Sequence, residues 1–219
     1  IAAAFASACA AQEWKTTVPF TYNIEYGPDH VGSEKYLKMI AEAPPDFLHV
    51  GEDIPFSSTF GTKADYAGVK ASLFKLLTPA EVRARIEDLK RYTDSLHKAG
   101  VRWVIPYICN ELAFGDHVRR TGFFQFFDNW DRYREFGYPP RPAEDIVGAV
   151  KFHPFQGLRR SKPEDAFHPF KVYTMCTNNP HWRAHLLAAT AAAARCGYDG
   201  IFVDVMTIRD YCPHCQRKF

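Results

Sequence analysis

Apolar and polar positions follow two different periods along the chain, and these periods predict alternating strands and helices. Residues 17–25 alternate apolar and polar side chains with a high aromatic content, as a strand does, and the turn residues Gly27 and Pro28 end the run. Residues 46–50 and 200–204 predict two more strands. Residues 101–108 form a mostly apolar run, which is typical of a strand buried on both faces of a parallel sheet.

Helical periodicity and capping signals predict three helices between these strands. A short helix is expected over about 33–41, before a Pro-Pro pair that forbids its continuation. The clearest helix spans 78–99, because Thr78 to Glu81 combine a capping box with a proline at the first helical position. A third helix is expected over 179–197, where Asn-Pro begins it and Cys-Gly ends it. The apolar face of the 78–99 helix consists of Val82, Ile86, Leu89 and Leu96.

Strands that alternate with amphipathic helices indicate an α/β protein with a parallel sheet. No G-x-G-x-x-G or Walker-type loop follows a predicted strand, which disfavours a dinucleotide-binding sheet. A (β/α)8 TIM barrel takes about 250 residues. We therefore expect residues 13–219 to be the N-terminal portion of such a barrel, about four βα units, truncated at the C-terminus. A long aromatic insertion over 110–173 follows the third strand.

Charge and composition narrow the classes of partner. The chain has 27 Lys and Arg against 25 Asp and Glu, a formal net charge of +2, so it lacks the electrostatic footprint of a nucleic-acid-binding or membrane-surface protein. No later stretch approaches the ~20 apolar residues that a transmembrane segment needs. A neutral ligand is therefore favoured.

The first residues have the composition of a targeting segment. Residues 1–12 contain a short apolar run with small residues of the A-x-A type, which predicts the remnant of a secretory signal peptide. The alternatives are an ordinary N-terminal helix and, less favoured, a lipoprotein acylated at Cys9. The working expectation is a secreted or periplasmic protein.

Polar residues at the predicted strand ends are the candidates for chemistry, because barrel enzymes place their active sites there. Asp204 is the most informative, since it follows a fully apolar strand. It is expected to act as nucleophile, general acid/base or acceptor for a sugar hydroxyl; the alternative is a structural carboxylate that holds a loop. The other candidates, as substrate-binding residues, are Glu25, Glu52, Asp53, Asn110 and Glu111.

The insertion is rich in aromatic side chains, two of which, Trp130 and Tyr138, are candidates for stacking on sugar rings. The alternative is that these rings form a small core for the insertion itself.

The segment from Cys212 to Cys215 is a CxxC motif, which serves either a redox dithiol or half of a zinc site. The thioredoxin-like context of a redox dithiol is missing. Zinc needs four ligands, and Asp210 and Cys176 are candidates for the other two. A Cys212–Cys215 disulfide or unpaired thiols are the alternatives.

Residues 172–219 resemble a segment of the family 42 β-galactosidases and related glycoside hydrolase-like proteins. The resemblance lies in Cys176 before an Asn-x-Pro helix start, in the strand 200–204 and in the terminal CxxC. It implies that Cys176, Cys212 and Cys215 bind structural zinc, with Asp210 where the family has a fourth cysteine.

That family carries Asp-Asn-Glu after strand four, and its glutamate is the acid/base. Here the aligned residue is Met206, which cannot transfer a proton. The closer likeness is to uncharacterised hydrolase-like relatives and to fucosidase-type barrels, which implies that Asp204 is the nucleophile.

Three hypotheses follow. The first is a retaining-type glycoside hydrolase acting on a neutral glycan, with Asp204 as nucleophile and an acid/base beyond Phe219. The second is a non-catalytic carbohydrate-binding barrel. The third, a zinc-dependent hydrolase, is least favoured, because a fully occupied structural zinc site leaves no open position for water.

Overall fold

The structure is a computed structural model that describes residues 21–24, 34–50, 54–56, 62–63, 75–143, 146, 158–159, 172–204 and 213–217. Its main element is a four-stranded parallel sheet in the order β1-β2-β5-β10. These strands span Thr21–Ile24, Phe47–Val50, Trp103–Cys109 and Phe202–Asp204. They coincide with the four strands that the sequence predicts, and their order in space is their order in the chain.

The three predicted helices are also present. They are α2 (Glu34–Glu42), α3 (Pro79–Lys98) and α5 (Pro180–Arg195), and one of them lies between each pair of consecutive strands of the parallel sheet. This alternation confirms a mixed α/β chain built from successive βα units. Closure into a barrel is not seen in the described residues, so the TIM barrel stays a prediction.

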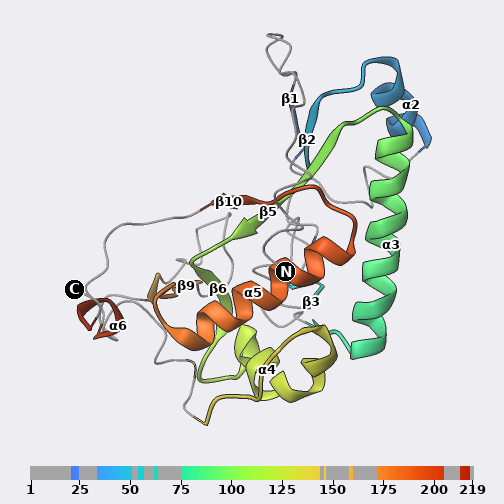
Figure 1. Cartoon of the computed structure of the whole chain (residues 1–219). Coiled ribbons are helices and arrows are strands. Elements are labelled where there is room, and N and C mark those ends of the chain that lie inside the picture. Colours follow the sequence, from blue (N-terminus) through green and yellow to red (C-terminus); the bar gives the residue numbers. More distant parts are fainter. Residues whose placement is uncertain are drawn as a thin grey trace, which may run out of the picture.

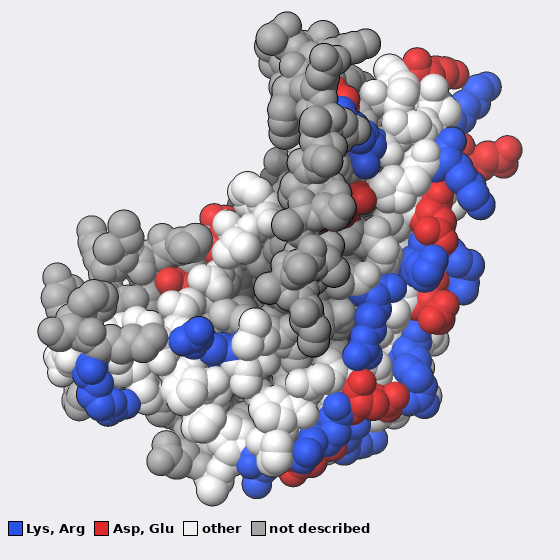
Figure 2. All heavy atoms as spheres, in the orientation of Figure 1, with Lys and Arg blue, Asp and Glu red and all other residues white. Residues whose placement is uncertain are grey.

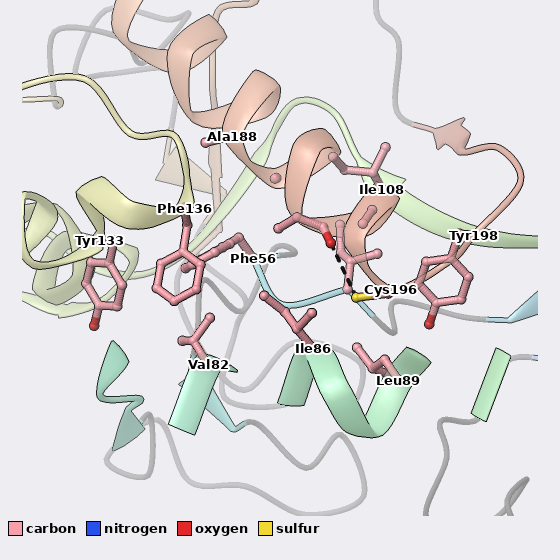
Figure 3. Packing of buried hydrophobic residues seen from close by; sticks show 14 of the residues in the cluster. Phe56, Val82, Ile86, Leu89, Ile108, Tyr133, Phe136, Ala188, Cys196 and Tyr198 are labelled. Atoms are coloured by element: carbon pink, nitrogen blue, oxygen red, sulfur yellow. Dashed lines mark hydrogen bonds between the residues drawn. The ribbon is translucent and has the colours of Figure 1, made fainter. Parts of the chain in front are cut away.

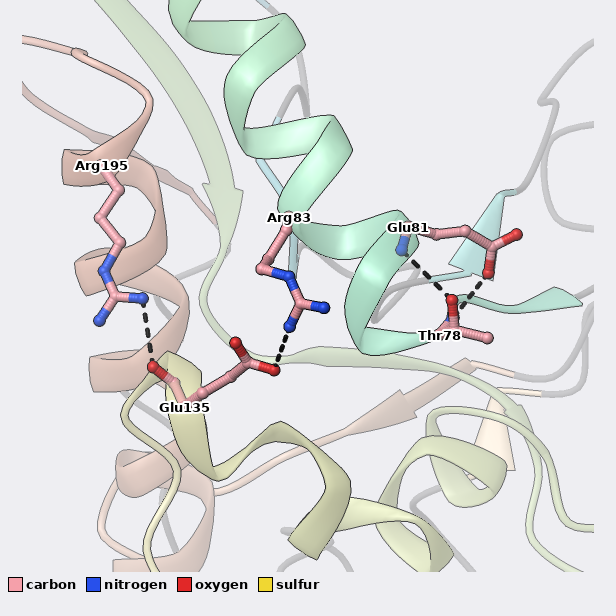
Figure 4. A network of polar contacts seen from close by, with 5 residues as sticks. All are labelled: Thr78, Glu81, Arg83, Glu135 and Arg195. Carbon is pink, nitrogen blue, oxygen red and sulfur yellow. Dashed lines mark hydrogen bonds and ion pairs between the residues drawn. The ribbon is translucent and has the colours of Figure 1, made fainter.

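The capping box that the sequence predicts forms at the start of α3. The backbone N–H of Glu81 donates to Oγ1 of Thr78 at 3.2 Å, and the backbone N–H of Thr78 donates to Oε2 of Glu81 at 2.7 Å (Figure 4). Two N–H groups that the helix leaves without an internal partner are thereby satisfied. The opposite end of α3 stops at Ala99, before Gly100 with φ of 102°.

The apolar face of α3 packs against the sheet and α5. Ile86 and Leu89 face Cys196, which caps the end of α5, and belong to one buried cluster with Ile108 of β5 (Figure 3). All four apolar residues that the sequence assigns to this face are buried. Burial of each such aliphatic side chain contributes about 1.5–3 kcal/mol. These residues form one buried cluster with the aromatic residues of the insertion.

The outer face of α3 is charged. Lys and Arg are interspersed with Asp and Glu along it, so neither sign dominates (Figure 2). Lys90 pairs with Asp94 at 3.0 Å, and Arg91 pairs with Asp88.

None of the helices in the described part of the chain has the length and apolarity that a membrane crossing requires.

The insertion after β5 forms a small antiparallel sheet and an aromatic core, which lie beyond the carboxyl end of β5 (Figure 1). The sheet has the order β7-β6-β9-β8, with strands at Thr121–Gly122, Leu112–Asp116, Val172–Thr174 and Leu158–Arg159. The helix α4 (Phe123–Asp128) and the 3-10 helix η2 (Trp130–Phe136) complete the insertion.

A separate antiparallel pair, β3 (Thr62–Lys63) and β4 (Lys75–Leu76), precedes α3 in the chain.

Polar contacts join the insertion to the helices of the parallel sheet. Glu135 of η2 accepts a hydrogen bond of 2.6 Å from Arg83 of α3 through Oε1, and one of 3.3 Å from Arg195 of α5 through its backbone oxygen (Figure 4). Inside, Phe56 contacts Tyr133 and Phe136 edge to face, at ring separations of 5.8 and 5.4 Å (Figure 3). The insertion is therefore packed on the parallel-sheet unit.

Candidate active site

Asp204 ends β10 at the carboxyl edge of the parallel sheet. Its strand pairs in parallel with β5, with Phe202 opposite Tyr107. The hydroxyl of Tyr107 donates a hydrogen bond of 2.9 Å to Oδ2 of Asp204. The carboxylate is exposed to solvent but has a fixed orientation, an arrangement that suits a group which must meet a ligand.

Two further side chains, His49 and Tyr107, share one face of the sheet near Asp204. In β2, Leu48 and Val50 are buried against the helices, so His49 between them projects from the opposite face. The same alternation in β5 brings Tyr107 to that face. The ring of Phe202 lies 4.9 Å from that of His49 and 6.0 Å from that of Tyr107.

His49 and Tyr107 are not among the residues that the sequence predicts for the site. The predicted residues are polar residues just past the strand ends, whereas these two lie inside strands. The signal that identifies them is the period of two, because a polar or aromatic residue between two buried aliphatic ones must occupy the other face. That face is only partly covered by the described residues, and Phe202 is 49% exposed. In β5, Trp103, Ile105 and Tyr107 on that face are partly buried, whereas Val104 and Ile108 on the other face are buried.

Asn110 and Glu111 follow β5 at the same edge of the sheet. Their backbone groups form hydrogen bonds to β10 and to the segment before α5. The backbone N–H of Asn110 donates to the backbone oxygen of Asp204 at 3.1 Å, and the indole of Trp182 donates to the oxygen of Asn110 at 2.8 Å. The backbone oxygen of Glu111 accepts from Met175 at 2.6 Å. Glu111 is 2% exposed, so its side chain is enclosed by protein, whereas Asn110 is half-buried.

Trp130, proposed from the sequence as a sugar contact, is buried completely. Its indole donates to the backbone oxygen of Pro139 at 2.8 Å, and its ring packs 4.8 Å from that of Tyr138, which is 2% exposed. Neither ring offers an open face, because the aromatic residues of the insertion pack on one another. The alternative interpretation, a core for the insertion, describes the observed packing.

Several predicted residues lie outside the described part of the chain. They are the segment 1–12, Glu25, Glu52, Asp53, Asp210 and Cys212.

Two of the predicted zinc ligands are brought together. Cys176 precedes α5 and Cys215 lies in α6 (Pro213–Gln216), and the two Sγ atoms are 3.4 Å apart. The two segments meet at the amino end of α5 (Figure 1). Both cysteines are fully buried, and they do not form a disulfide with each other.

Polar side chains surround this cysteine pair. The amide of Asn178 donates to Sγ of Cys215 at 3.3 Å. Asn179 caps α5 by accepting from two backbone N–H groups through Oδ1, and its Nδ2 lies 3.0 Å from Nε2 of His214. Among the described residues, no group of three or more His, Cys, Asp or Glu side chains is placed to hold a metal ion.

Comparison with known proteins gives no family. No protein-family model matches the sequence, and no curated protein matches it. The similar solved structures include a cycloisomaltooligosaccharide glucanotransferase of Paenibacillus sp., with a TM-score of 0.47 and 17% identity over 88% of this chain. They also include a noncanonic maltogenic α-amylase, AmyB, of Thermotoga neapolitana, with a TM-score of 0.42 and 14% identity over 86% of this chain.

This chain spans 25% of the first of these structures and 39% of the second. Both TM-scores are below 0.5, a likeness too low to carry an argument about fold or activity. Neither match singles out the family 42 β-galactosidases or the fucosidases.

Proposed function

We propose that this chain belongs to a glycoside hydrolase that acts on a neutral glycan, with Asp204 as its nucleophile. The observation that carries the proposal is the place of Asp204. It is an exposed carboxylate at the carboxyl end of the fourth strand of a sequentially ordered parallel sheet, oriented by the hydroxyl of Tyr107. Enzymes built from successive βα units place their catalytic groups at this edge.

The proposed chemistry is a double displacement. Oδ1 of Asp204, the oxygen that Tyr107 does not bind, attacks the anomeric carbon, and the glycosidic C–O bond breaks as the leaving oxygen takes a proton from a general acid. Water then attacks the glycosyl-enzyme bond and loses its proton to the same group, which restores both residues. A retaining pair of carboxyl groups stands about 5–5.5 Å apart. Since Glu111 is enclosed by protein, the general acid is assigned to a residue outside the described part of the chain.

The face that carries His49, Tyr107 and Phe202 is proposed to hold the sugar ring next to Asp204. The half-exposed ring of Phe202 offers an apolar surface for the C–H face of a sugar, and the rings of His49 and Tyr107 lie beside it. The same feature favours the second candidate, a carbohydrate-binding protein that does not cleave. Measured turnover separates the two.

The test is the replacement of Asp204 by Asn, assayed on a panel of aryl glycosides. Loss of the nucleophile should lower kcat by at least about a thousandfold. Asp204→Gly with added azide should restore turnover and release a glycosyl azide, because the small anion takes the place of the carboxylate. Asp199→Asn is the matched control, since Asp199 lies just before β10, at its opposite end.

Unchanged turnover in Asp204→Asn would remove Asp204 as the nucleophile. A wild-type chain that binds oligosaccharides and cleaves none of the panel would favour the binding protein instead.

We also propose that Cys176 and Cys215 bind structural zinc, together with Cys212 and Asp210. Their Sγ–Sγ distance of 3.4 Å is well beyond the ~2.0 Å of a disulfide. It is close to the roughly 3.8 Å that separates two thiolates on a tetrahedral zinc ion with Zn–S bonds of about 2.3 Å. The N–H···S bond from Asn178 is of the kind that orients a ligand thiolate. Zinc here would fasten the segment before α5 to α6.

Native mass spectrometry before and after chelation tests the metal. One zinc ion should be lost on chelation, and it should be absent from Cys176→Ser and Cys215→Ser. Cys196→Ser is the control: Cys196 is also a buried free cysteine, but its Sγ lies 3.3 Å from the backbone oxygen of Ala192 within α5. A mass lower by two hydrogens with no metal would point to a disulfide and would contradict the proposal.

A further inference from the structure

The cysteines of the zinc site proposed above come from two segments, and three polar side chains hold these segments together. Cys176 precedes α5, whereas Cys215 lies in α6, 39 residues later in the chain. Their Sγ atoms can meet at 3.4 Å only if both segments keep fixed positions. The side chains that fix them are those of Asn178, Asn179 and His214.

Asn179 joins three parts of the chain. Its backbone N–H donates to the backbone oxygen of Cys176 at 2.9 Å, which fixes the turn after this cysteine. Its Oδ1 accepts from the backbone N–H groups of His181 and Trp182 at 2.8 and 3.2 Å, so the side chain caps α5. A backbone N–H can only donate, so these two bonds fix the orientation of the amide. The atom that lies 3.0 Å from Nε2 of His214 is therefore the nitrogen Nδ2.

This contact decides the role of His214, the histidine inside the CxxC motif. Histidine is a common zinc ligand, and it binds the metal through a ring nitrogen that carries no proton. Since Nδ2 of Asn179 donates, Nε2 of His214 accepts from it and the ring proton is on Nδ1. Zinc at Nε2 would displace the amide, and zinc at Nδ1 would move the ring proton to Nε2, against the amide donor. His214 therefore fastens α6 to the cap of α5 and does not bind the metal.

Two further observations concern the same ring. The guanidinium of Arg217 lies 2.7 Å from Nδ1 of His214, but this long side chain is exposed and can turn into solvent, whereas the cap fixes Asn179. Within the described part of the chain, His214 does not join the two cysteines in a cluster that could hold a metal ion. Both agree with a histidine that acts through Asn179.

Asn178 contacts a sulfur directly. Its side-chain amide donates to Sγ of Cys215 at 3.3 Å. Because Asn178 follows Cys176 by two residues, this bond also ties the segment of the first cysteine to the second. A partner that donates to a ligand atom from outside fixes the direction of that ligand and raises the affinity for the metal.

We propose that Asn178, Asn179 and His214 are positioning residues of the zinc site, and that His214 is not itself a ligand. The inference rests on the zinc site proposed above. Asn178 orients the thiolate of Cys215, while Asn179 and His214 hold α6 against the start of α5. The two cysteines are thereby kept close together before the metal binds. A site arranged in advance loses less conformational freedom on binding, which strengthens the binding.

Titration of the full chain with cobalt(II), followed by competition with zinc(II), tests the role of Asn178. Cobalt in a tetrahedral thiolate site absorbs visible light, and its bands report the ligands. Asn178→Ala should weaken zinc binding about 10–100-fold. It should also move the sulfur-to-cobalt charge-transfer band to lower energy, because a sulfur without its hydrogen bond holds its lone pairs less tightly. Thr177→Ala is the control, since Thr177 is half-buried in the same segment and, among the described contacts, does not bind either sulfur.

The same titration tests His214 with two variants. His214→Ala should weaken zinc binding about 10–100-fold and leave the cobalt bands in place, because no ligand is lost. His214→Gln keeps an acceptor for Asn179 and should recover most of the affinity. His181→Ala is the control, because His181 contacts Asn179 through its backbone alone. Circular dichroism checks that each variant folds.

The outcomes separate this inference from the zinc site itself. Altered visible bands in His214→Ala, or no recovery in His214→Gln, would overturn the positioning role of His214. Wild-type affinity in Asn178→Ala or His214→Ala would overturn the proposal as well. If the wild-type chain binds neither metal, the zinc site is wrong, and this inference is overturned with it.

Discussion

The hydroxyl of Tyr107 donates to Oδ2 of Asp204 at 2.9 Å, and this bond links the third and fourth strands of the parallel sheet through side chains. Tyr107 of β5 lies opposite Phe202 of β10 in the register. Phe202 is two residues before Asp204 in the same strand. The bond thus directs the carboxylate of Asp204 toward Tyr107, while Asp204 stays exposed to solvent. A bond of this kind costs little stability to lose, because Asp204 is exposed, but it sets the direction of the carboxylate.

Replacement of Tyr107 by Phe should therefore reduce catalysis more than stability. Hydrogen bonds to charged groups contribute about 1.5–3 kcal/mol, and solvent exposure places this one at the low end, so kcat should fall by roughly tenfold. KM and the unfolding temperature should change little. Steady-state kinetics on the aryl glycoside that wild type cleaves measures this, with Tyr198→Phe in the core as control. Wild-type kcat in Tyr107→Phe would mean that the bond does not orient a reacting group.

Asp199 should show the opposite behaviour to Asp204. Its Oδ2 accepts from the backbone N–H of Val104 at 2.8 Å and lies 3.3 Å from Nε2 of His97, so it fastens α3 and the start of β5 to the loop before β10. Asp199→Asn should lower the free energy of unfolding by about 1–2 kcal/mol and leave kcat unchanged. Denaturant unfolding and the aryl glycoside assay together test this. A large loss of kcat at full stability would place Asp199, too, in the site.

Local signals predicted the main elements of the fold. The capping box at Thr78 and the Asn-Pro start at Asn179 both form as expected, because a cap depends only on residues within one turn. The parallel order of β1, β2, β5 and β10 follows from the alternation of strands and helices.

The second sheet could not be predicted in the same way. Leu112 of β6 pairs with Thr174 of β9, and the long stretch of chain between them carries no periodic signal that connects the two. The β-strands β7 and β8 have only two residues each, too few for a period to show. Asp204 could be predicted as a site residue from its position at the end of a strand. His49 and Tyr107 could not, because the sequence does not say which face of the sheet the helices cover.

Loss of the α3 cap should have a measurable and limited cost. Thr78→Ala removes the side-chain oxygen that accepts from Glu81, which should lower stability by about 1 kcal/mol. In a chain of this size that corresponds to about 2–4 °C in Tm. Thr78→Ser keeps the oxygen and should stay close to wild type in a thermal melt. Equal losses in both variants would show that the methyl group matters, and not the cap.

His185 should make the fold sensitive to acid. It is buried among aromatic rings, and the hydroxyl of Tyr138 lies 3.0 Å from its Nδ1. Burial lowers the pKa of His185 from 6.5 to about 3 and raises that of Tyr138, so the phenol donates to a neutral imidazole. Between about pH 3 and 6.5 the unfolded chain binds a proton that the folded chain excludes. Stability therefore falls as the pH falls through this window, by about 1.4 kcal/mol per pH unit, and the effect is absent above it.

His185→Gln keeps an acceptor for Tyr138 and has no proton to gain. Between pH 6.5 and 4.5 its free energy of unfolding should therefore drop by about 2–3 kcal/mol less than that of wild type. His181→Gln, on the first turn of the same helix and partly exposed, keeps His185 and should retain the wild-type slope. Urea unfolding at a series of pH values measures all three proteins. Parallel curves for wild type and His185→Gln would mean that the imidazole reaches solvent, and that the aromatic core around it opens before the chain unfolds.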